Sequence, residues 1–254
     1  MQYVSPSEII NRDGLRIVLV QHMPSPWGQA AKAMMEYKGL TFSAAPWEGG
    51  GLNQEIVAWS GSNSAPVVAW NKEKPIYRWD DILFLTERLA PAKPLIPEAI
   101  EDRVLTLGLC HEICGERGLG WNRRLSLFSP GLMSGAAPQS LQRMGEKYGF
   151  APDEVAQLDS RQVASLNMLT KRLKSQQAAG SQFFVGQGVT AVDFFWAAFC
   201  NIFNPPPAKI CPIPEQARAM FENISATIRA ALDPVLLAHR DRIMTAYFKI
   251  PMEM

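Results

Sequence analysis

The chain has 254 residues, of which 47% are hydrophobic, so it is long and apolar enough to form one large or two moderate folded domains. Its 25 basic and 24 acidic residues leave a formal net charge of +1, which gives no electrostatic reason to expect nucleic acid or an anionic membrane as a partner. No charged start is followed by an apolar run, and the apolar stretch 192–203 is too short for a bilayer, so we expect a cytoplasmic protein.

The first predicted elements are a strand at 16–21 and a helix at 26–38. The strand is β-branched and apolar, and Ser25, Pro26 and Gly39 stand at the positions typical of an N-cap, a first helical residue and a helix stop. Several apolar residues of the helix share one stripe, which we expect to be buried against a sheet: Trp27, Ala30, Ala31, Met34 and Met35.

Strand and helix signals continue to alternate after this helix. We expect strands at 40–45, 67–70 and 75–77, a short helix near 53–59 and a helix at 80–89, with a hairpin turn at 72–74. Such alternation predicts a mixed sheet with helices packed on it, and hence an α+β fold for this region.

Two prolines outline a candidate site. Pro26 opens the first helix behind Ser25, and the free N–H groups of a helix start suit an anion or a thiolate. Pro66 stands between Ala65 and an apolar strand, where a cis peptide bond in a tight turn is plausible. Ser25 has a second interpretation, because helix capping by itself explains a serine at this position.

A proline-rich segment divides the chain. Three prolines, Pro91, Pro94 and Pro97, precede a region whose patterns are almost entirely helical. We therefore expect domains at 1–91 and 98–254, joined by a linker at 92–97. The helical segments are predicted at 98–127, 138–149, 153–177, 191–202, 214–230 and 234–246.

One helix start in the second domain is well marked. Thr190 and Asp193 have the spacing of a capping box, and the residues that follow are apolar on every side. We expect the helix 191–202 to lie at the buried centre of this domain.

The cysteines and histidines are weaker signals. Four cysteines without a secretory context are expected as reduced thiols. Cys110, His111 and Cys114 share one helix, which favours buried helix cysteines over a metal site, so no metal is predicted. His22 lies near the candidate site, where a structural histidine is the alternative to a base.

With these motifs the chain resembles the cytosolic glutathione S-transferases over residues 15–203. The most specific segments are Phe184–Asp193, which is similar to the family's second-domain folding motif, and Ala65-Pro66-Val67, which is similar to its cis-proline turn. The resemblance implies a thioredoxin-like first domain that holds glutathione, an all-helical second domain that lines the co-substrate pocket, and a homodimer. It does not assign a transferase class.

The resemblance also implies roles for individual residues. Ser25 falls where the family places a serine or cysteine near the glutathione sulfur, and Trp27 falls within the same glutathione-binding segment. Ala65, before Pro66, falls where backbone groups pair with the cysteinyl part of the tripeptide.

The γ-glutamyl position departs from the family. Arg78 and Trp79 stand where most members have an acidic or amide residue followed by Ser or Thr. Neither side chain can accept from the glutamyl ammonium, and Asp80 or Asp81 is the candidate replacement.

The second domain contributes candidates for the co-substrate pocket. Trp121, Asn122 and Arg124 follow a glycine break in a helix that faces this pocket in the family. The alternative is a solvated, basic helix end.

The leading prediction is therefore a glutathione transferase that conjugates glutathione to a small electrophile, as in detoxification. Ser25 would donate its hydroxyl to the thiolate: lowering a thiol pKa by about two units needs roughly 2.7 kcal/mol, and a hydrogen bond to a charged group supplies about 1.5–3 kcal/mol. The alternatives are a non-catalytic ligand- or protein-binding module of the same fold, which Arg78 and Trp79 favour, and a glutathione-dependent reductase or dehalogenase.

Overall fold

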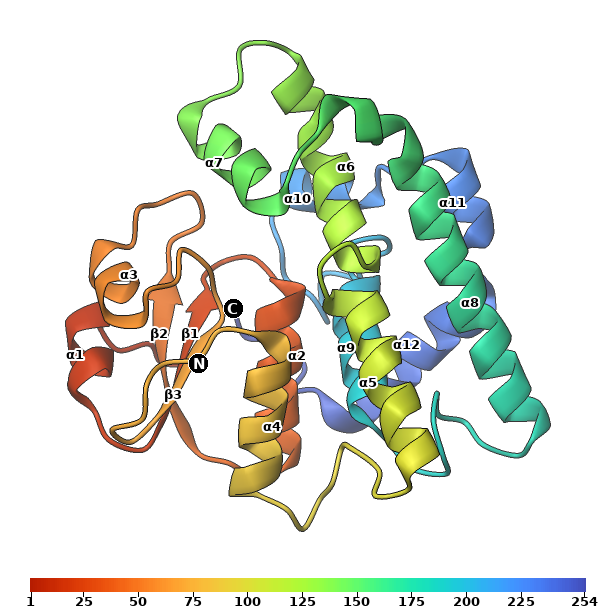
Figure 1. Ribbon diagram of the computed structural model, residues 1–254, viewed down its shortest axis with the longest axis horizontal. Helices are drawn as coiled ribbons and strands as arrows, with labels where there is room; N and C mark the ends of the chain where they lie inside the picture. The colour runs from red at the N-terminus through yellow and green to blue at the C-terminus, as the bar shows by residue number, and fades with distance from the viewer.

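The computed structural model describes all 254 residues and shows a small sheet with its helices beside a larger, all-helical part (Figure 1). The fold is α+β, as the sequence predicted. The sheet has three strands in the order β2-β1-β3. The central strand β1 (Leu15–Val20) pairs in parallel with β2 (Phe42–Trp47) and antiparallel with β3 (Val67–Trp70).

Each face of the sheet is covered by helices. On one face α1 (Pro6–Asn11) and α3 (Gln54–Ser60) bury Ile9 and Ile56 against Val18 and Val67. On the other face lie α2 (Pro26–Tyr37) and α4 (Trp79–Leu89). Three details differ from the sequence prediction: α1 was not foreseen, the second strand starts two residues later, and the strand at 75–77 is a single bridge between Val68 and Ile76.

The helix α2 is buried on two sides rather than on one. Ala31 and Met35 pack against the sheet, whereas Ala30 and Met34 belong to the core of the helical part. The prediction of a single stripe facing the sheet was therefore wrong. Because α2 lies between the sheet and α9 (Ala191–Cys200), most of its circumference is apolar or buried.

The helical part follows the predicted segments, with two of them divided. The segment 98–127 is broken at Gly115–Gly118, and the segment 214–230 is broken before Ser225. Besides α9, its elements are α5 (Ile100–Cys114), α6 (Leu119–Met133), α7 (Gln139–Tyr148), the 3₁₀-helix η1 (Pro152–Gln157), α8 (Leu158–Ala178), α10 (Glu215–Glu222), α11 (Ala226–Ala231) and α12 (Pro234–Tyr247).

The helix α9 forms the centre of the helical part, and all its residues are buried. Its capping box is present: Asp193 accepts a hydrogen bond from the Thr190 backbone N–H at 2.8 Å, and Thr190 also caps the helix. Asp193 further binds the ring of His239 on α12 at 2.9 Å and the N–H of Phe184 at 3.2 Å. The predicted buried helix and its start are confirmed.

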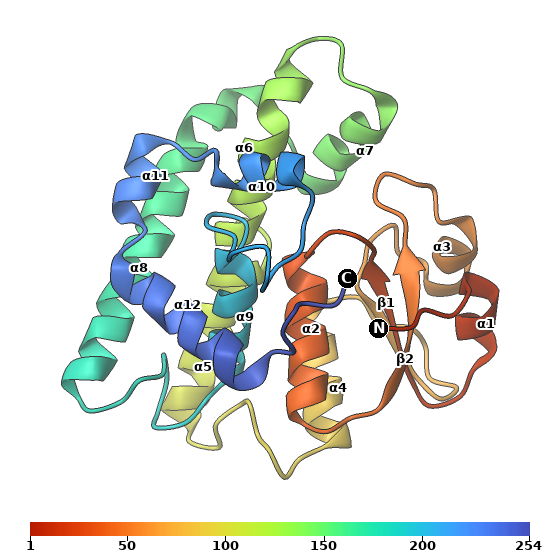
Figure 2. The same ribbon diagram turned by 180° about the vertical axis from the view of Figure 1, so that it is seen from behind.

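The end of the chain returns to the sheet part (Figure 2). Glu253 forms ion pairs with the amino group of Met1 at 3.0 Å and with Lys32 of α2 at 3.4 Å. Its carbonyl oxygen accepts from the Gln29 side chain at 3.1 Å. The last residues of the chain, which follow the helical part, thus bind α2 of the sheet part. None of the helices combines the length and hydropathy needed to cross a bilayer.

Candidate functional site

The turn between β1 and α2 joins the carboxyl end of β1 to Ser25, the residue before α2. The start of α2 lies at the end of the sheet part that faces α7 (Figure 1). The first turn of α2 lies close to β1, since a Cβ atom on Gly28 would come within 2.9 Å of the Leu19 side chain. Ser25 occupies the N-cap position and is largely buried, yet its side chain makes no capping hydrogen bond. Its hydroxyl group is therefore available at the positive end of the α2 dipole.

The second half of the site is the turn before β3. The peptide bond between Ala65 and Pro66 is cis, as the sequence suggested. Neither the N–H nor the carbonyl oxygen of Ala65 has a hydrogen-bond partner within the chain. A half-buried backbone with both groups unpaired is a ready partner for another extended peptide.

A narrow crevice lies where α2, the cis-proline turn, α4 and α9 approach one another. Trp27, two residues after Ser25, and Pro66 both line it, together with Trp79 at the start of α4 and Phe195 from α9. Its walls are almost entirely apolar. Of the residues predicted for the glutathione site, Trp27, Pro66 and Trp79 therefore meet at this crevice, whereas Ser25, Ala65, Arg78 and Asp80 do not line it.

The start of α4 carries charges that are already paired. Arg78 donates from Nε and Nη2 to the two carboxylate oxygens of Asp80, at 3.1 and 2.8 Å. Partial burial acts to raise the pKa of Asp80, but the hydrogen bond and charge of Arg78 outweigh it and lower that pKa. Asp80 therefore stays ionised, with the exposed Arg78 beside it.

Trp79 turns away from this pair and into the protein. Its ring packs edge-on against Phe195 at 5.7 Å and lies 6.3 Å from the ring of His111. No hydroxyl or amide group replaces it at the first position of α4, so the usual glutamyl contact is missing from this side.

The helical part faces the site with aromatic and basic side chains. Trp27 donates its indole N–H to the Cys114 carbonyl at the end of α5, 2.8 Å away, and packs on Phe199. The guanidinium of Arg124 lies over the Trp27 ring, 5.9 Å from its centre. Trp121 donates to the carbonyl oxygen of Tyr148 at 2.9 Å.

Asn122 has a structural position instead. It is 2% exposed, and its amide group binds the carbonyl oxygens of Arg117 and Gly118 in the break between α5 and α6. Of the three residues predicted for the co-substrate pocket, Arg124 and Trp121 lie at the aromatic cluster beside Trp27, whereas Asn122 stabilises the helix start.

Lys147 belongs to the site, although the sequence did not point to it. It lies near the end of α7 and donates to the Ser64 hydroxyl at 2.6 Å, next to the cis-proline turn. Burial lowers its pKa to about 8, and the nearby charge of Arg124 adds to this shift. In the sequence Lys147 is an ordinary polar residue at the end of a helix. Its position beside the cis-proline turn depends on a contact with Ser64, which is 83 residues away in the chain.

The remaining candidates have structural surroundings. All four cysteines are buried free thiols, and burial raises the pKa of Cys110 and Cys114 well above the usual value. These two are therefore inert helix cysteines rather than thiolates. No group of three His, Cys, Asp or Glu side chains could hold a metal ion. His22 is exposed in a left-handed backbone conformation with a φ of 63°.

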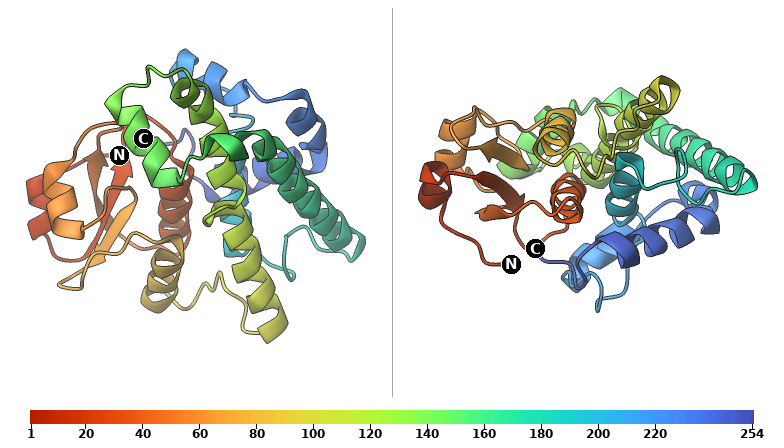
Figure 3. Two further views of the ribbon diagram at one scale, coloured as in Figure 1. Left: turned by 45° about the horizontal axis from the view of Figure 1, so that its top comes forward. Right: turned by 90° about the horizontal axis from the view of Figure 1, so that it is seen from below.

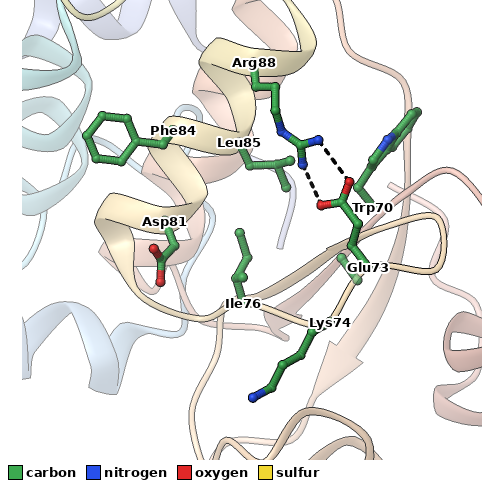
Figure 4. Close-up of a pocket in the computed structure, with 9 residues that line it drawn as sticks. Trp70, Glu73, Lys74, Ile76, Asp81, Phe84, Leu85 and Arg88 are labelled. Atoms are coloured by element: carbon green, nitrogen blue, oxygen red, sulfur yellow. Dashed lines mark hydrogen bonds and ion pairs between the residues drawn. The ribbon is translucent and has the colours of Figure 1, made fainter.

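A separate pocket lies on the outer side of α4 (Figure 4). Arg88 and Glu73 form a two-pronged ion pair at one edge of it, while Phe84 projects away from that pair. This pocket shares no lining residue with the cavity beside Pro66, so we do not count it as part of the site.

No protein-family model matches the sequence, and no curated protein matches it either. Solved structures do match. A glutathione S-transferase of Methylobacillus flagellatus, with glutathione bound, is 10% identical over 91% of this chain and 95% of its own, with a TM-score of 0.63. One from Methylobacterium radiotolerans, in complex with glutathione sulfonate, is 16% identical over 91% and 90%, with a TM-score of 0.62.

A beta-etherase from Sphingobium sp. is similar as well, at 14% identity over 90% of this chain and 99% of its own, with a TM-score of 0.58. These likenesses extend over both the sheet part and the helical part. The chain therefore has the fold of the glutathione transferases, with a thioredoxin-like sheet part followed by an all-helical part.

Proposed function

We propose that the protein binds glutathione at the edge of its sheet and conjugates the thiolate to a small electrophile. The observation that carries this proposal is a pair of unused polar groups, the Ser25 hydroxyl at the start of α2 and the Ala65 backbone at the cis-proline turn. Glutathione bound in one structural neighbour and glutathione sulfonate in another support the same class of ligand. In this proposal residues 1–91 hold glutathione, 92–97 connect, and 98–254 line the co-substrate pocket.

Ser25 acts as the thiol activator. Its O–H donates to the glutathione sulfur, and the start of α2 adds a favourable dipole, so the thiol releases its proton to water and remains as thiolate. A hydrogen bond to a charged group is worth about 1.5–3 kcal/mol, which corresponds to a pKa decrease of about one to two units. The thiolate then attacks the electrophile, forms the C–S bond and expels the leaving group as an anion.

The tripeptide backbone is held by the cis-proline turn. The free N–H and carbonyl of Ala65 pair with the cysteinyl residue, with Pro66 and Trp27 forming the apolar floor beneath it. The glutamyl end is a zwitterion, and the Arg78–Asp80 pair offers one charge to each of its groups. Arg78 would bind the glutamyl carboxylate and Asp80 its ammonium group, in place of the missing acceptor at Trp79.

We further propose that the electrophile lies between Trp27, Trp121 and Arg124, and that the enzyme is a cytoplasmic homodimer serving detoxification. The outer surface supports a dimer. Val104 on α5 is 66% exposed at a groove that α5 and α8 form together, and Phe84 is 49% exposed at the separate pocket on α4. Exposed apolar residues at a groove are typical of a surface covered by another subunit.

The first experiment is isothermal titration of the protein with reduced glutathione, combined with ultraviolet detection of bound thiolate. We expect micromolar to millimolar binding and a thiolate signal near neutral pH. Ser25→Ala should abolish that signal and lower kcat/KM with 1-chloro-2,4-dinitrobenzene by about tenfold to hundredfold. Ser175→Ala, on the exposed side of α8, is the matched control and should change neither.

The alternative function is a binding module without catalytic activity. A non-catalytic binding module is favoured by Trp79, which removes the usual glutamyl contact. Absence of glutathione binding at several millimolar would exclude the transferase and leave this module. Reduction or dehalogenation by the same thiolate would instead preserve glutathione binding and Ser25 dependence, and product analysis separates those reactions from conjugation. A redox role through Ser25 itself is disfavoured, because serine cannot form a mixed disulfide.

A further inference from the structure

Two cations beside the site have no acidic partner. Arg124 forms no salt bridge and no hydrogen bond within the chain, and its Nε atom is buried without a partner. Lys147 forms no salt bridge, and its one hydrogen bond is to the neutral hydroxyl of Ser64. Both side chains are half-buried.

Other cations with comparable or greater burial are satisfied. Lys32 pairs with Glu36 at 3.0 Å, and Lys38 pairs with Glu87 at 2.8 Å. Arg123, the neighbour of Arg124, points to the other side of α6 and donates to the carbonyl oxygens of Ile202 and Phe221. Arg124 and Lys147 differ from these cations because neither a carboxylate nor a backbone carbonyl accepts a hydrogen bond from them.

The two charges lie close to each other. The positive charge of Arg124 contributes to the lowered pKa of Lys147, after burial. Holding two like charges together in a partly buried place costs free energy unless an anion joins them. No carboxylate of this chain forms an ion pair with either side chain.

The surroundings indicate which anion fits. Arg124 lies over Trp27, and Tyr148 is within 6.3 Å of Trp27 and 4.7 Å of Trp121, measured between ring centres. In the left view of Figure 3 the light-green α7 lies over the sheet part, and α7 packs against α6. A flat apolar body would pack against these rings, while a planar carboxylate matches the guanidinium fork and the ammonium group.

We propose that Arg124 and Lys147 are the carboxylate-binding end of the co-substrate pocket, so that the electrophile is an aromatic or apolar acid. This inference rests on the proposed function for the identity of the reaction, but the anion site can be tested without it. The positive end selects the acid, and the aromatic walls orient its reactive carbon toward the thiolate.

The test compares 3-nitrobenzoate with its neutral isostere 3-nitrobenzamide, titrated onto the full chain by calorimetry without glutathione. We expect the acid to bind at least tenfold more tightly. Arg124→Gln and Lys147→Met should each lower affinity for the acid by about tenfold to hundredfold and leave the amide unchanged. Arg143→Gln, an exposed arginine one turn earlier on α7, is the control and should have no effect.

The proposal would be overturned if the wild type bound the acid and the amide equally. It would also be overturned if both variants kept the wild-type affinity for the acid. The same conclusion would follow from a result in which the variants spare 3-nitrobenzoate and instead weaken glutathione but not its glycyl monoethyl ester. That pattern would place the glycyl carboxylate of glutathione on the pair. Conjugation of 4-chloro-3-nitrobenzoate to glutathione is measured separately. If the protein prefers the acid in binding but catalyses no conjugation, only the proposed function is refuted. Circular dichroism of each variant confirms that it is folded.

Discussion

The residue that most affects the proposed glutathione site is Trp79. It occupies the first position of α4, where the resemblance implies a hydroxyl for the glutamyl group, and it packs on Phe195 instead. In the proposed complex, glutathione relies on the Arg78–Asp80 pair at its glutamyl end. This arrangement predicts that glutathione affinity is limited by one side chain.

Trp79→Ser should therefore strengthen glutathione binding by about tenfold, because it adds a hydrogen-bonding hydroxyl and removes the bulk beside it. The same change should lower the free energy of unfolding by about 2–4 kcal/mol through the lost packing. Calorimetry and urea unfolding measure the two effects. Trp59→Ser, on the opposite side of the sheet, serves as the control: it should destabilise the fold without tightening glutathione. Weaker binding in Trp79→Ser would show that the indole itself holds the tripeptide.

Lys147 makes stability depend on pH in a defined window. Its pKa is lowered from 10.5 to about 8 in the folded protein, so between these values the unfolded chain binds more protons than the folded one. Stability therefore rises with pH across this window, and the full penalty is present below about pH 8. Lys147→Met removes the penalty.

We expect Lys147→Met to exceed the wild type in unfolding free energy near neutral pH, and this advantage to shrink by about 2 kcal/mol by pH 9.5. Urea unfolding of both proteins at a series of pH values measures the difference. An advantage that does not change with pH would mean that Lys147 titrates normally in the folded state.

At the scale of elements, α9 is held by a buried carboxylate. Asp193 accepts from Thr190 and Phe184 and binds His239, so one side chain joins the start of α9 to the preceding loop and to α12. Asp193→Ala should lower the free energy of unfolding by about 3–5 kcal/mol, because it leaves several buried polar groups without a partner.

Denaturant unfolding compares this variant with Asp13→Ala. Asp13 pairs with Lys72 on the surface, where both side chains are exposed and solvent screens the pair, so its loss should lower the free energy of unfolding far less than the loss of Asp193. Similar losses in the two variants would contradict the central role of Asp193.

At the scale of the whole molecule, α2 joins the sheet part to the helical part, and the outer surface is where a second copy would bind. The core of the helical part continues into α2 and α4 through Ala30, Met34 and Leu83, so the sheet part and the helical part share apolar contacts. On the outside, Phe84 and Val104 are exposed apolar side chains, and Val104 tests the proposed dimer.

Val104→Asp is expected to convert a dimer to a monomer, since a charge at a covered apolar contact must be desolvated. Analytical ultracentrifugation measures the mass. Met133→Asp, an equally exposed apolar position at the end of α6, is the control and should leave the dimer intact. A wild-type protein that sediments as a monomer at all concentrations would remove the dimer from the proposal.

Local features were predictable from the sequence because neighbouring residues determine them. The strand before Ser25, the helix that Pro26 opens, the turn at Pro66 and the capping box at Asp193 each depend on a few consecutive residues. The central place of α9 followed in the same way, since a helix that is apolar on all sides has to be buried.

Tertiary structure decided the features that join distant parts of the chain. The contact of Lys147 with Ser64, the hydrogen bond of Trp27 to Cys114 and the two-sided burial of α2 leave no local pattern. The unpaired state of Arg124 depends on which acids the fold brings near it. The sequence by itself therefore determined the local elements on which the proposed site is built, whereas packing between the sheet and the helices decided which charges lie beside them.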